Sequence, residues 1–320
     1  MSGEMDILVV HIGAGLHNPA STHRYKTLIR TALSQSSILE SSRVIESSPL
    51  TNTGYGSSLN VLGRVECDAS FIRGEKIGAV VGMLCRHPIL ETFRVFEHLR
   101  GVYASEPDLT LPVMLTYPSL KDVIPGIHEH DDAELISPKS QKVFDMHKDR
   151  VFQSKEIEQL PHGISDTVGL IHIQDETTTL ATSSGGNSFK LPGRIGCAGM
   201  LGAGIAFKES GDVKVSCMCS GNGEQIMRCA LARTIVDRVG DVLEEMYGEC
   251  IDGVLSLLLP DVLYVGFIVV VQRGTRVLLV YGHTTESFHF GFRYLDKTKV
   301  VLSYAEQEGK LTFGEYVLSS

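Results

Sequence analysis

Short apolar runs and amphipathic stretches alternate along the chain, which predicts strands interleaved with helices. Residues 6–11 are an apolar run that leads to Gly13-Ala14-Gly15, so we expect a buried strand that ends in a tight glycine turn. Apolar residues recur at roughly helical spacing over 22–46 and 88–99, and residues 65–72 and 78–84 have the pattern of two paired strands. Residues 47–63 are rich in Ser, Asn, Gly and Thr and should form an ordered, irregular loop.

The pattern changes in the middle of the chain. Residues 117–165 contain several prolines and many charges without a sustained period, and we expect a mobile surface segment with short helical pieces. Strands are predicted at 167–173, 180–184 and 213–218, helices over 224–239 and on to about 259, and a hairpin at 265–271 and 276–281. Hairpins interleaved with helix pairs favour α+β layers over a doubly wound parallel fold.

Composition narrows the class of protein. Hydrophobic residues make up 43% and charged residues 21%, which is typical of a globular chain. The net charge of −9, without a long Lys/Arg run, argues against general nucleic-acid binding. Pro260 and Asp261 interrupt the most apolar stretch, so we expect no membrane span. The seven scattered cysteines, and the lack of a glycosylation sequon or a leader-like N-terminus, favour a reduced intracellular protein.

Three short motifs invite functional readings that their context does not favour. Gly13-Ala14-Gly15 lacks the third glycine of a dinucleotide fingerprint, so a turn near a site is the better interpretation. The run His128–Asp132 resembles a metal site, but ligands this close in sequence usually form a solvated loop. Cys217 and Cys219 should share one strand face as a buried thiol pair.

A more informative set of residues follows the middle segment. Asp166-Thr167 opens a strand, and three polar, glycine-containing segments come after it, at residues 183–186, 191–196 and 220–224. A threonine hydroxyl is a poor nucleophile unless a base lies beside it. Cleavage of the Asp166–Thr167 bond would expose an α-amino group with a reference pKa of about 7.7–8.0. Thr167 would then be nucleophile and base in one residue.

The later segments could complete such a site. Ser220 and the N–H of Gly221, at a helix start, could hold a developing oxyanion. Arg194 offers a bidentate fork for a carboxylate. This chemistry requires no metal and no organic cofactor.

These segments resemble the type-2 asparaginase family of N-terminal-nucleophile hydrolases, and within it the threonine aspartases. The resemblance covers nearly the whole chain, in residues 10–15, 48–57, 59–70, 166–169, 183–186, 192–196, 220–224 and 282–287. It implies one hydrolase domain, residues 1–320, folded as a four-layer αββα sandwich. It also implies self-cleavage into an alpha subunit, residues 1–166, and a beta subunit, residues 167–320, which stay associated and pair again into a dimer.

The resemblance also implies a role for each residue of the site. Self-cleavage would fall between Asp166 and Thr167. The catalytic residues would be Thr167 as nucleophile, Ser184 as its hydrogen-bond partner, and Ser220 with Gly221 at the oxyanion. The substrate-binding residues would be Arg194 as carboxylate clamp, Gly13 and Gly15 beside the pocket, and Asn52.

Two positions distinguish the subfamilies. Asparaginases and isoaspartyl peptidases usually carry Gly before the threonine, where this chain has Asp166, as threonine aspartases do. They also carry an aspartate three residues after the clamp arginine, which grips a free α-amino group; here that residue is Cys197. We therefore expect a threonine endopeptidase that cuts protein substrates after aspartate, in the cytoplasm or nucleus. The alternatives are an L-asparaginase or β-aspartyl (isoaspartyl) peptidase on the same machinery, and an inactive binding scaffold.

Overall fold

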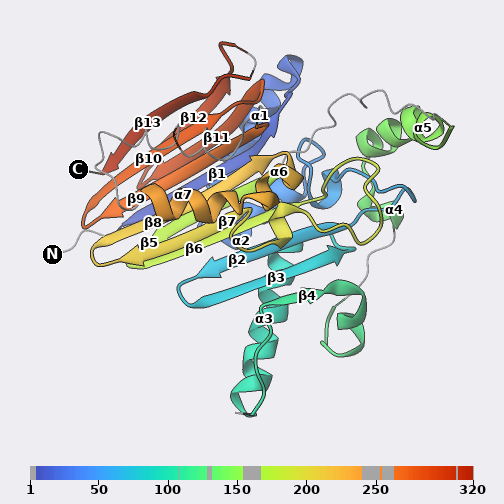
Figure 1. Cartoon of the computed structure of the whole chain (residues 1–320), viewed down its shortest axis with the longest axis horizontal. Coiled ribbons are helices and arrows are strands. Elements are labelled where there is room, and N and C mark those ends of the chain that lie inside the picture. The colour runs from blue at the N-terminus through green and yellow to red at the C-terminus, as the bar shows by residue number, and fades with distance from the viewer. Residues whose placement is uncertain are drawn as a thin grey trace.

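Two stacked β-sheets lie between two layers of helices in the computed structural model (Figure 1). The structure describes residues 5–106, 108–127, 132–153, 167–239, 253, 263–307 and 309–319. Within these ranges, no helix is long and apolar enough to cross a membrane.

The larger sheet has eight strands in the order β12-β11-β1-β5-β6-β2-β3-β4. Neighbouring strands are antiparallel except β3 and β4, which are parallel. The strands are β1 (Asp6–Gly15), β2 (Cys67–Arg73), β3 (Lys76–Met83), β4 (Met114–Thr116), β5 (Val168–Gln174), β6 (Thr177–Ser184), β11 (Ser287–Tyr294) and β12 (Lys297–Tyr304). The strand that follows Thr167 therefore lies in the middle of this sheet.

The smaller sheet has five antiparallel strands in the order β13-β10-β9-β8-β7. They are β7 (Ile205–Ser210), β8 (Val213–Gly221), β9 (Val265–Arg273), β10 (Arg276–His283) and β13 (Thr312–Ser319). The predicted hairpin at 265–281 is confirmed as β9 and β10.

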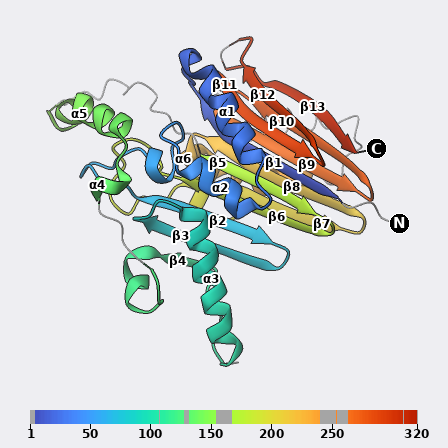
Figure 2. The same ribbon diagram turned by 180° about the vertical axis from the view of Figure 1, so that it is seen from behind.

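Helices cover the outer face of each sheet, as the two opposite views show (Figures 1 and 2). The larger sheet carries α1 (Thr22–Leu33), α2 (Ile38–Glu46) and α3 (Pro88–Ala104), and the smaller sheet carries α6 (Gly223–Arg228) and α7 (Leu231–Val239). Two further helices, α4 (Asp132–Leu135) and α5 (Pro138–Gln153), lie to one side of the sheets. Short 3-10 turns are η1 (Pro19–Ser21), η2 (Gly54–Gly56), η3 (Tyr117–Asp122) and η4 (Cys197–Gly199).

The alternation of side chains along the central strands explains the layers. In β5, Val168 and Leu170 pack with the helices of the larger sheet, whereas Ile171 and Ile173 pack between the two sheets. A strand that is apolar on both faces needs a covering layer on each side, because successive side chains point in opposite directions. The α+β sandwich expected from the sequence is confirmed.

The predicted glycine turn at Gly13–Gly15 is wrong. β1 continues to Gly15, and the chain instead forms an irregularity in the pairing with β11 between His11 and Ala14. Gly13 has φ 114, a conformation that favours glycine. A bulge uses the same residue type as a turn, so the sequence pattern alone does not separate the two.

The prediction of a surface segment over residues 117–165 is also wrong in part. Tyr117 and Leu135 are fully buried against the core beneath the helices, and α5 is a helix of 16 residues. Residues 128–131, which include most of the acidic-histidine motif, and residues 154–166 lie outside the described residues. Most of the predicted helical stretch after Val239 does so too.

Other elements were missed or merged. The pattern over 224–239 predicts one helix, but the chain breaks at Ala230, with φ 44, into α6 and α7. β11 was not predicted, although Phe288, Phe290 and Phe292 alternate with polar residues and glycine. It pairs with β1 on one side and with the edge strand β12 on the other, so it is an interior strand of the larger sheet.

Candidate active site

Thr167 lies directly before the central strand β5 and is 2% exposed. Its Oγ1 is 3.7 Å from the Sγ of Cys197, the first residue of η4. The hydroxyl of the predicted nucleophile and the residue that distinguishes the subfamilies are therefore in contact. Asp166, the predicted partner in self-cleavage, lies outside the described residues.

Ser184 is brought beside Thr167 by strand register. β5 and β6 are antiparallel with Val168 opposite Ser183, which places Ser184 across from Thr167 at the ends of the two strands. The Oγ of Ser184 accepts a hydrogen bond of 3.0 Å from the N–H of Gly186. This bond orients the hydroxyl at the turn that leaves the sheet.

Ser220 and Gly221 end β8, in the facing sheet. The Oγ of Ser220 accepts a hydrogen bond of 3.0 Å from the N–H of Ala14, so it connects β8 to the irregular end of β1. This bond uses one of the two lone pairs of the Ser220 hydroxyl and leaves its O–H to donate to another acceptor. Gly221 has φ 128, and a Cβ there would lie 2.3 Å from the carbonyl oxygen of Tyr264. Only glycine fits at this position.

The glycine segment of β1 is held from both sides. Ala14 donates to Ser220, and the carbonyl of Gly15 accepts a hydrogen bond of 2.7 Å from Ser287. The structure thus places Gly13 and Gly15 beside the predicted oxyanion residues. A substrate-binding role for the two glycines stays a prediction.

Asn52 joins the loop before β2 to the turn after β6. Its Nδ2 donates to the carbonyl of Gly186 at 2.8 Å, and its Oδ1 accepts from the N–H of Ser58 at 2.7 Å. These contacts suit a residue that braces the turn after Ser184. Its predicted contact with substrate stays a prediction.

Arg194 lies on the loop before η4, and its side chain is 15% exposed. A Cβ at Gly186 or Gly196 would lie about 3 Å from its Nη1 (3.0 and 2.9 Å), and a Cβ at Gly223 would lie 2.8 Å from its Nη2. The guanidinium thus lies close against three glycine positions, where an added side chain would force it to shift. Glu224 forms an ion pair with it, with 2.9 Å from Nε and 2.8 Å from Nη2 to Oε1.

Asp68 fixes the loop that carries Arg194 and Cys197, and sequence reasoning did not single it out. Its two carboxylate oxygens accept hydrogen bonds from the N–H of Gly196 at 2.7 Å and from that of Gly82 at 3.0 Å. Burial raises the pKa of Asp68, although Lys190 and these two donors act in the opposite direction. A polar residue inside the strand pattern of residues 65–72 was the available signal.

A second buried carboxyl, that of Glu46, lies behind Ser184. Its Oε1 accepts hydrogen bonds from the Ser183 hydroxyl at 2.8 Å and from the N–H of Ile89 at 3.0 Å. Burial raises the pKa of Glu46 to about 8, so the carboxyl is mainly neutral at physiological pH. A single glutamate at the end of a predicted helix gives no sequence signal that its carboxyl is buried behind Ser184.

The chemistry of the assembled residues centres on Thr167. Burial raises the pKa of the Cys197 thiol to about 11, so this neighbour of the threonine carries no charge at neutral pH.

Cys217 and Cys219, predicted as a buried pair, are confirmed as buried, with their sulfurs 3.8 Å apart. Among the described residues, no group of three or more His, Cys, Asp or Glu is arranged to hold a metal.

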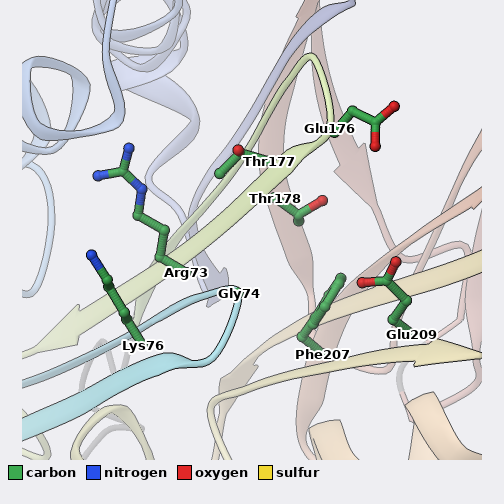
Figure 3. Close-up of a pocket in the computed structure, with 8 residues that line it drawn as sticks. All are labelled: Arg73, Gly74, Lys76, Glu176, Thr177, Thr178, Phe207 and Glu209. Atoms are coloured by element: carbon green, nitrogen blue, oxygen red, sulfur yellow. The ribbon is translucent and has the colours of Figure 1, made fainter.

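A surface cavity of about 380 Å³ lies at the other end of β5, away from Thr167 (Figure 3). It opens between the β2–β3 turn, the β5–β6 turn and β7. Figure 3 shows the side chains of Arg73 and Lys76 on one side and that of Glu209 on the other, so they do not converge on one point. At about 3.3 Å per residue, the length of β5 separates this cavity from Thr167 by roughly 20 Å.

Comparison with known proteins identifies the family of the chain. A family model described as asparaginase matches residues 11–301, and the chain belongs to the type-2 asparaginase family, whose members are N-terminal-nucleophile hydrolases. The chain is 28% identical over 219 residues to a plant-type L-asparaginase of Pyrococcus horikoshii, which covers 66% of this chain and 68% of that protein. It is likewise 28% identical to the plant-type L-asparaginase of Pyrococcus abyssi, over 62% of this chain and 64% of that protein.

An animal relative matches over a longer stretch. The isoaspartyl peptidase/L-asparaginase of Mus musculus is 29% identical over 246 residues, which is 75% of this chain and 71% of that protein. The matched region thus spans about two thirds of the archaeal relatives' length and slightly more of the mouse protein.

Proposed function

We propose that this chain is a self-processing threonine hydrolase that cleaves protein substrates after aspartate. The observation that carries the choice is the contact between Thr167 and Cys197, at 3.7 Å, with the thiol held neutral by burial. Asparaginases have an aspartate at this position for the free α-amino group of a small substrate. A neutral thiol gives an ammonium no counter-charge, whereas a peptide that continues through the position needs none.

The processing step begins in the intact chain. The Thr167 Oγ attacks the carbonyl carbon of Asp166, the C–N bond breaks as the acyl group moves from nitrogen to oxygen, and the Thr167 nitrogen takes the proton. Water then hydrolyses the resulting ester, which leaves Asp166 with a carboxylate and Thr167 with a free amine. That amine has a reference pKa of about 7.7–8.0, so much of it is neutral near pH 7.5.

In the processed enzyme the Thr167 amine accepts the proton from Oγ as Oγ attacks the carbonyl that follows the substrate aspartate. The O–H of Ser220 and the N–H of Gly221 stabilise the developing oxyanion, and Arg194 binds the aspartate carboxylate. The proton passes to the leaving amine, and water releases the acyl group from Oγ. Each residue in this scheme lies on the rim formed by β5, β6, β8 and the η4 loop.

One gel tests the processing step. The purified protein should resolve into two fragments, residues 1–166 and 167–320, whereas the Thr167→Ala variant should remain whole. A wild-type chain that stays intact would refute self-processing. Mass spectrometry of the smaller fragment should then identify Thr167 as its first residue.

The names of the relatives favour a second candidate, an L-asparaginase or isoaspartyl peptidase on the same residues. A peptide with one internal Asp, its Asn counterpart, L-asparagine and a β-aspartyl dipeptide separate the two. Cleavage of the first peptide alone supports the endopeptidase. Ammonia release from L-asparagine without peptide cleavage would assign the second function. Pairing of processed units into a dimer is a further part of the proposal, which light scattering can check.

A further inference from the structure

Glu224 contacts Arg194 through its side chain and has no place in the scheme above. It is the second residue of α6, and its N–H is capped by the side chain of Asn222 at 3.1 Å. Its carboxylate Oε1 accepts a hydrogen bond from the Nε of Arg194 at 2.9 Å. The Glu224 side chain is 53% exposed, whereas that of Arg194 is 15% exposed, so the pair lies where the site opens to solvent.

Glu224 faces one edge of the guanidinium, the edge formed by Nε and Nη2. Nε makes an aligned hydrogen bond to Glu224. Nη2 lies 2.8 Å from the same oxygen but, among the described residues, this solvent-inaccessible atom has no hydrogen-bond acceptor in an aligned geometry. A guanidinium has five N–H donors in a fixed plane, so one held along its Nε–Nη2 edge still presents the outer edge formed by Nη1 and Nη2 to a second carboxylate.

Arg194 is further confined by the glycines around it. A Cβ at Gly196 would lie 2.9 Å from Nη1, and a Cβ at Gly223 would lie 2.8 Å from Nη2. These contacts restrict where the guanidinium lies, but a flat group can still rotate about its own stem. The hydrogen bond from Nε to Glu224 removes that freedom.

We propose that Glu224 is the positioning residue of the carboxylate clamp, which holds the Nε–Nη2 edge of Arg194 so that the end of the guanidinium formed by Nη1 and Nη2 meets the aspartate carboxylate of the ligand. The inference rests on the proposed function only in that Arg194 binds an aspartate-type carboxylate. The positioning role of Glu224 requires the length of its side chain and one acceptor oxygen. Its negative charge is not required, because a negative charge beside the clamp opposes binding of a second carboxylate.

Two variants separate reach from charge. Glu224→Gln keeps the length of the side chain and an oxygen that can accept from Nε, but removes the charge. Glu224→Asp keeps the charge and suits the first turn of a helix, but is one methylene too short to reach Nε. Glu40→Ala is the matched control, because it removes an exposed glutamate from the first turn of α2, away from the site.

The experiment measures dissociation constants by calorimetry for the purified full-length protein, in whichever state it is isolated, with L-aspartate and with a peptide that ends in aspartate as probes. For Glu224→Asp we expect weaker binding by roughly 10- to 100-fold, the range for loss of a hydrogen bond to a charged group. For Glu224→Gln and Glu40→Ala we expect values within about threefold of wild type, since the bond is retained or untouched. With any substrate that is turned over, Glu224→Asp should raise KM by a similar factor and leave kcat within about threefold.

Binding as strong in Glu224→Asp as in wild type would overturn the inference, and tighter binding would show that Glu224 competes with the ligand. Binding by Glu224→Gln as weak as by Glu224→Asp would also overturn it, because charge and not position would then matter. If wild type binds L-aspartate but not the peptide, the endopeptidase proposal fails while the role of Glu224 is still measured. If wild type binds neither probe, there is no clamp to position and the inference fails.

Discussion

Replacing Cys197 by aspartate should shift the preference of the site from peptides with an internal aspartate toward free L-asparagine. In the wild type, Cys197 is 2% exposed, and its sulfur is 3.7 Å from the Thr167 Oγ1. Aspartate is close to cysteine in size, so the substitution changes the charge at this point more than the volume. It restores the carboxylate that asparaginases carry three residues after the clamp arginine.

The size of the expected change in kcat/KM for L-asparagine follows from two opposing contributions to the free energy, the attraction between charges and the cost of burying a carboxylate. A carboxylate about 4 Å from the ammonium of bound asparagine contributes about 4 kcal/mol at an effective dielectric constant of about 20. Burying the new carboxylate costs several kcal/mol, and burial is already the main cause of the raised pKa of Cys197. Arg194 offsets part of that cost and Asp68 adds to it, since both act on the charge at this position. We expect a net gain of about 1–3 kcal/mol, or roughly 5- to 150-fold in kcat/KM for L-asparagine.

The assay compares two rates for each protein, ammonia release from L-asparagine and cleavage of a peptide with one internal aspartate. In Cys197→Asp the first rate should rise, and the second should fall, because an internal amide leaves the new carboxylate buried without a counter-charge. Cys197→Asn is the control, with nearly the same shape and no charge. An unchanged ratio of the two rates in Cys197→Asp, or an equal change in Cys197→Asn, would refute the reasoning that charge at this position selects the substrate.

Two predictions concern stability. Burial lowers the pKa of His11 to about 3, of His17 to about 4 and of His289 to about 3, so the unfolded chain binds protons that the folded chain does not. The contribution of these histidines to the free energy of unfolding is therefore fully present above the unfolded pKa of about 6.5. It is lost as the pH falls below that value, by about 2 kcal/mol per histidine at pH 5. Urea unfolding at pH 7.5 and pH 5 measures this, and equal free energies of unfolding would contradict it. Gly169→Ala should destabilise the protein by about 2–3 kcal/mol, because the new Cβ would lie 2.3 Å from the Nε2 of His11. Gly101→Ala, in open space within α3, should instead stabilise the protein by up to about 1 kcal/mol. Equal melting temperatures of the two variants would show that the contact with His11 does not exclude a side chain at Gly169.

Local pattern was sufficient for much of the fold. The apolar run of β5, the helical spacing of α1 and α2, and the hairpin of β9 and β10 follow from side-chain periodicity, which depends only on neighbouring residues. The same reasoning failed at Gly13, because a bulge and a turn need the same backbone freedom. It also failed at Ala230, where one amphipathic stripe is divided between α6 and α7.

The sequence by itself determined which residues could form the site and in which segments they lie, since Thr167, Ser184, Arg194 and Ser220 stand in short polar motifs between predicted elements. Only the tertiary structure decided their partners. Ser220 accepts from Ala14, 206 residues away, because two different sheets meet there. Periodicity tells which face a side chain occupies, but a hydrogen bond also depends on which distant segment is packed against that face, and that follows from the fold of the whole chain.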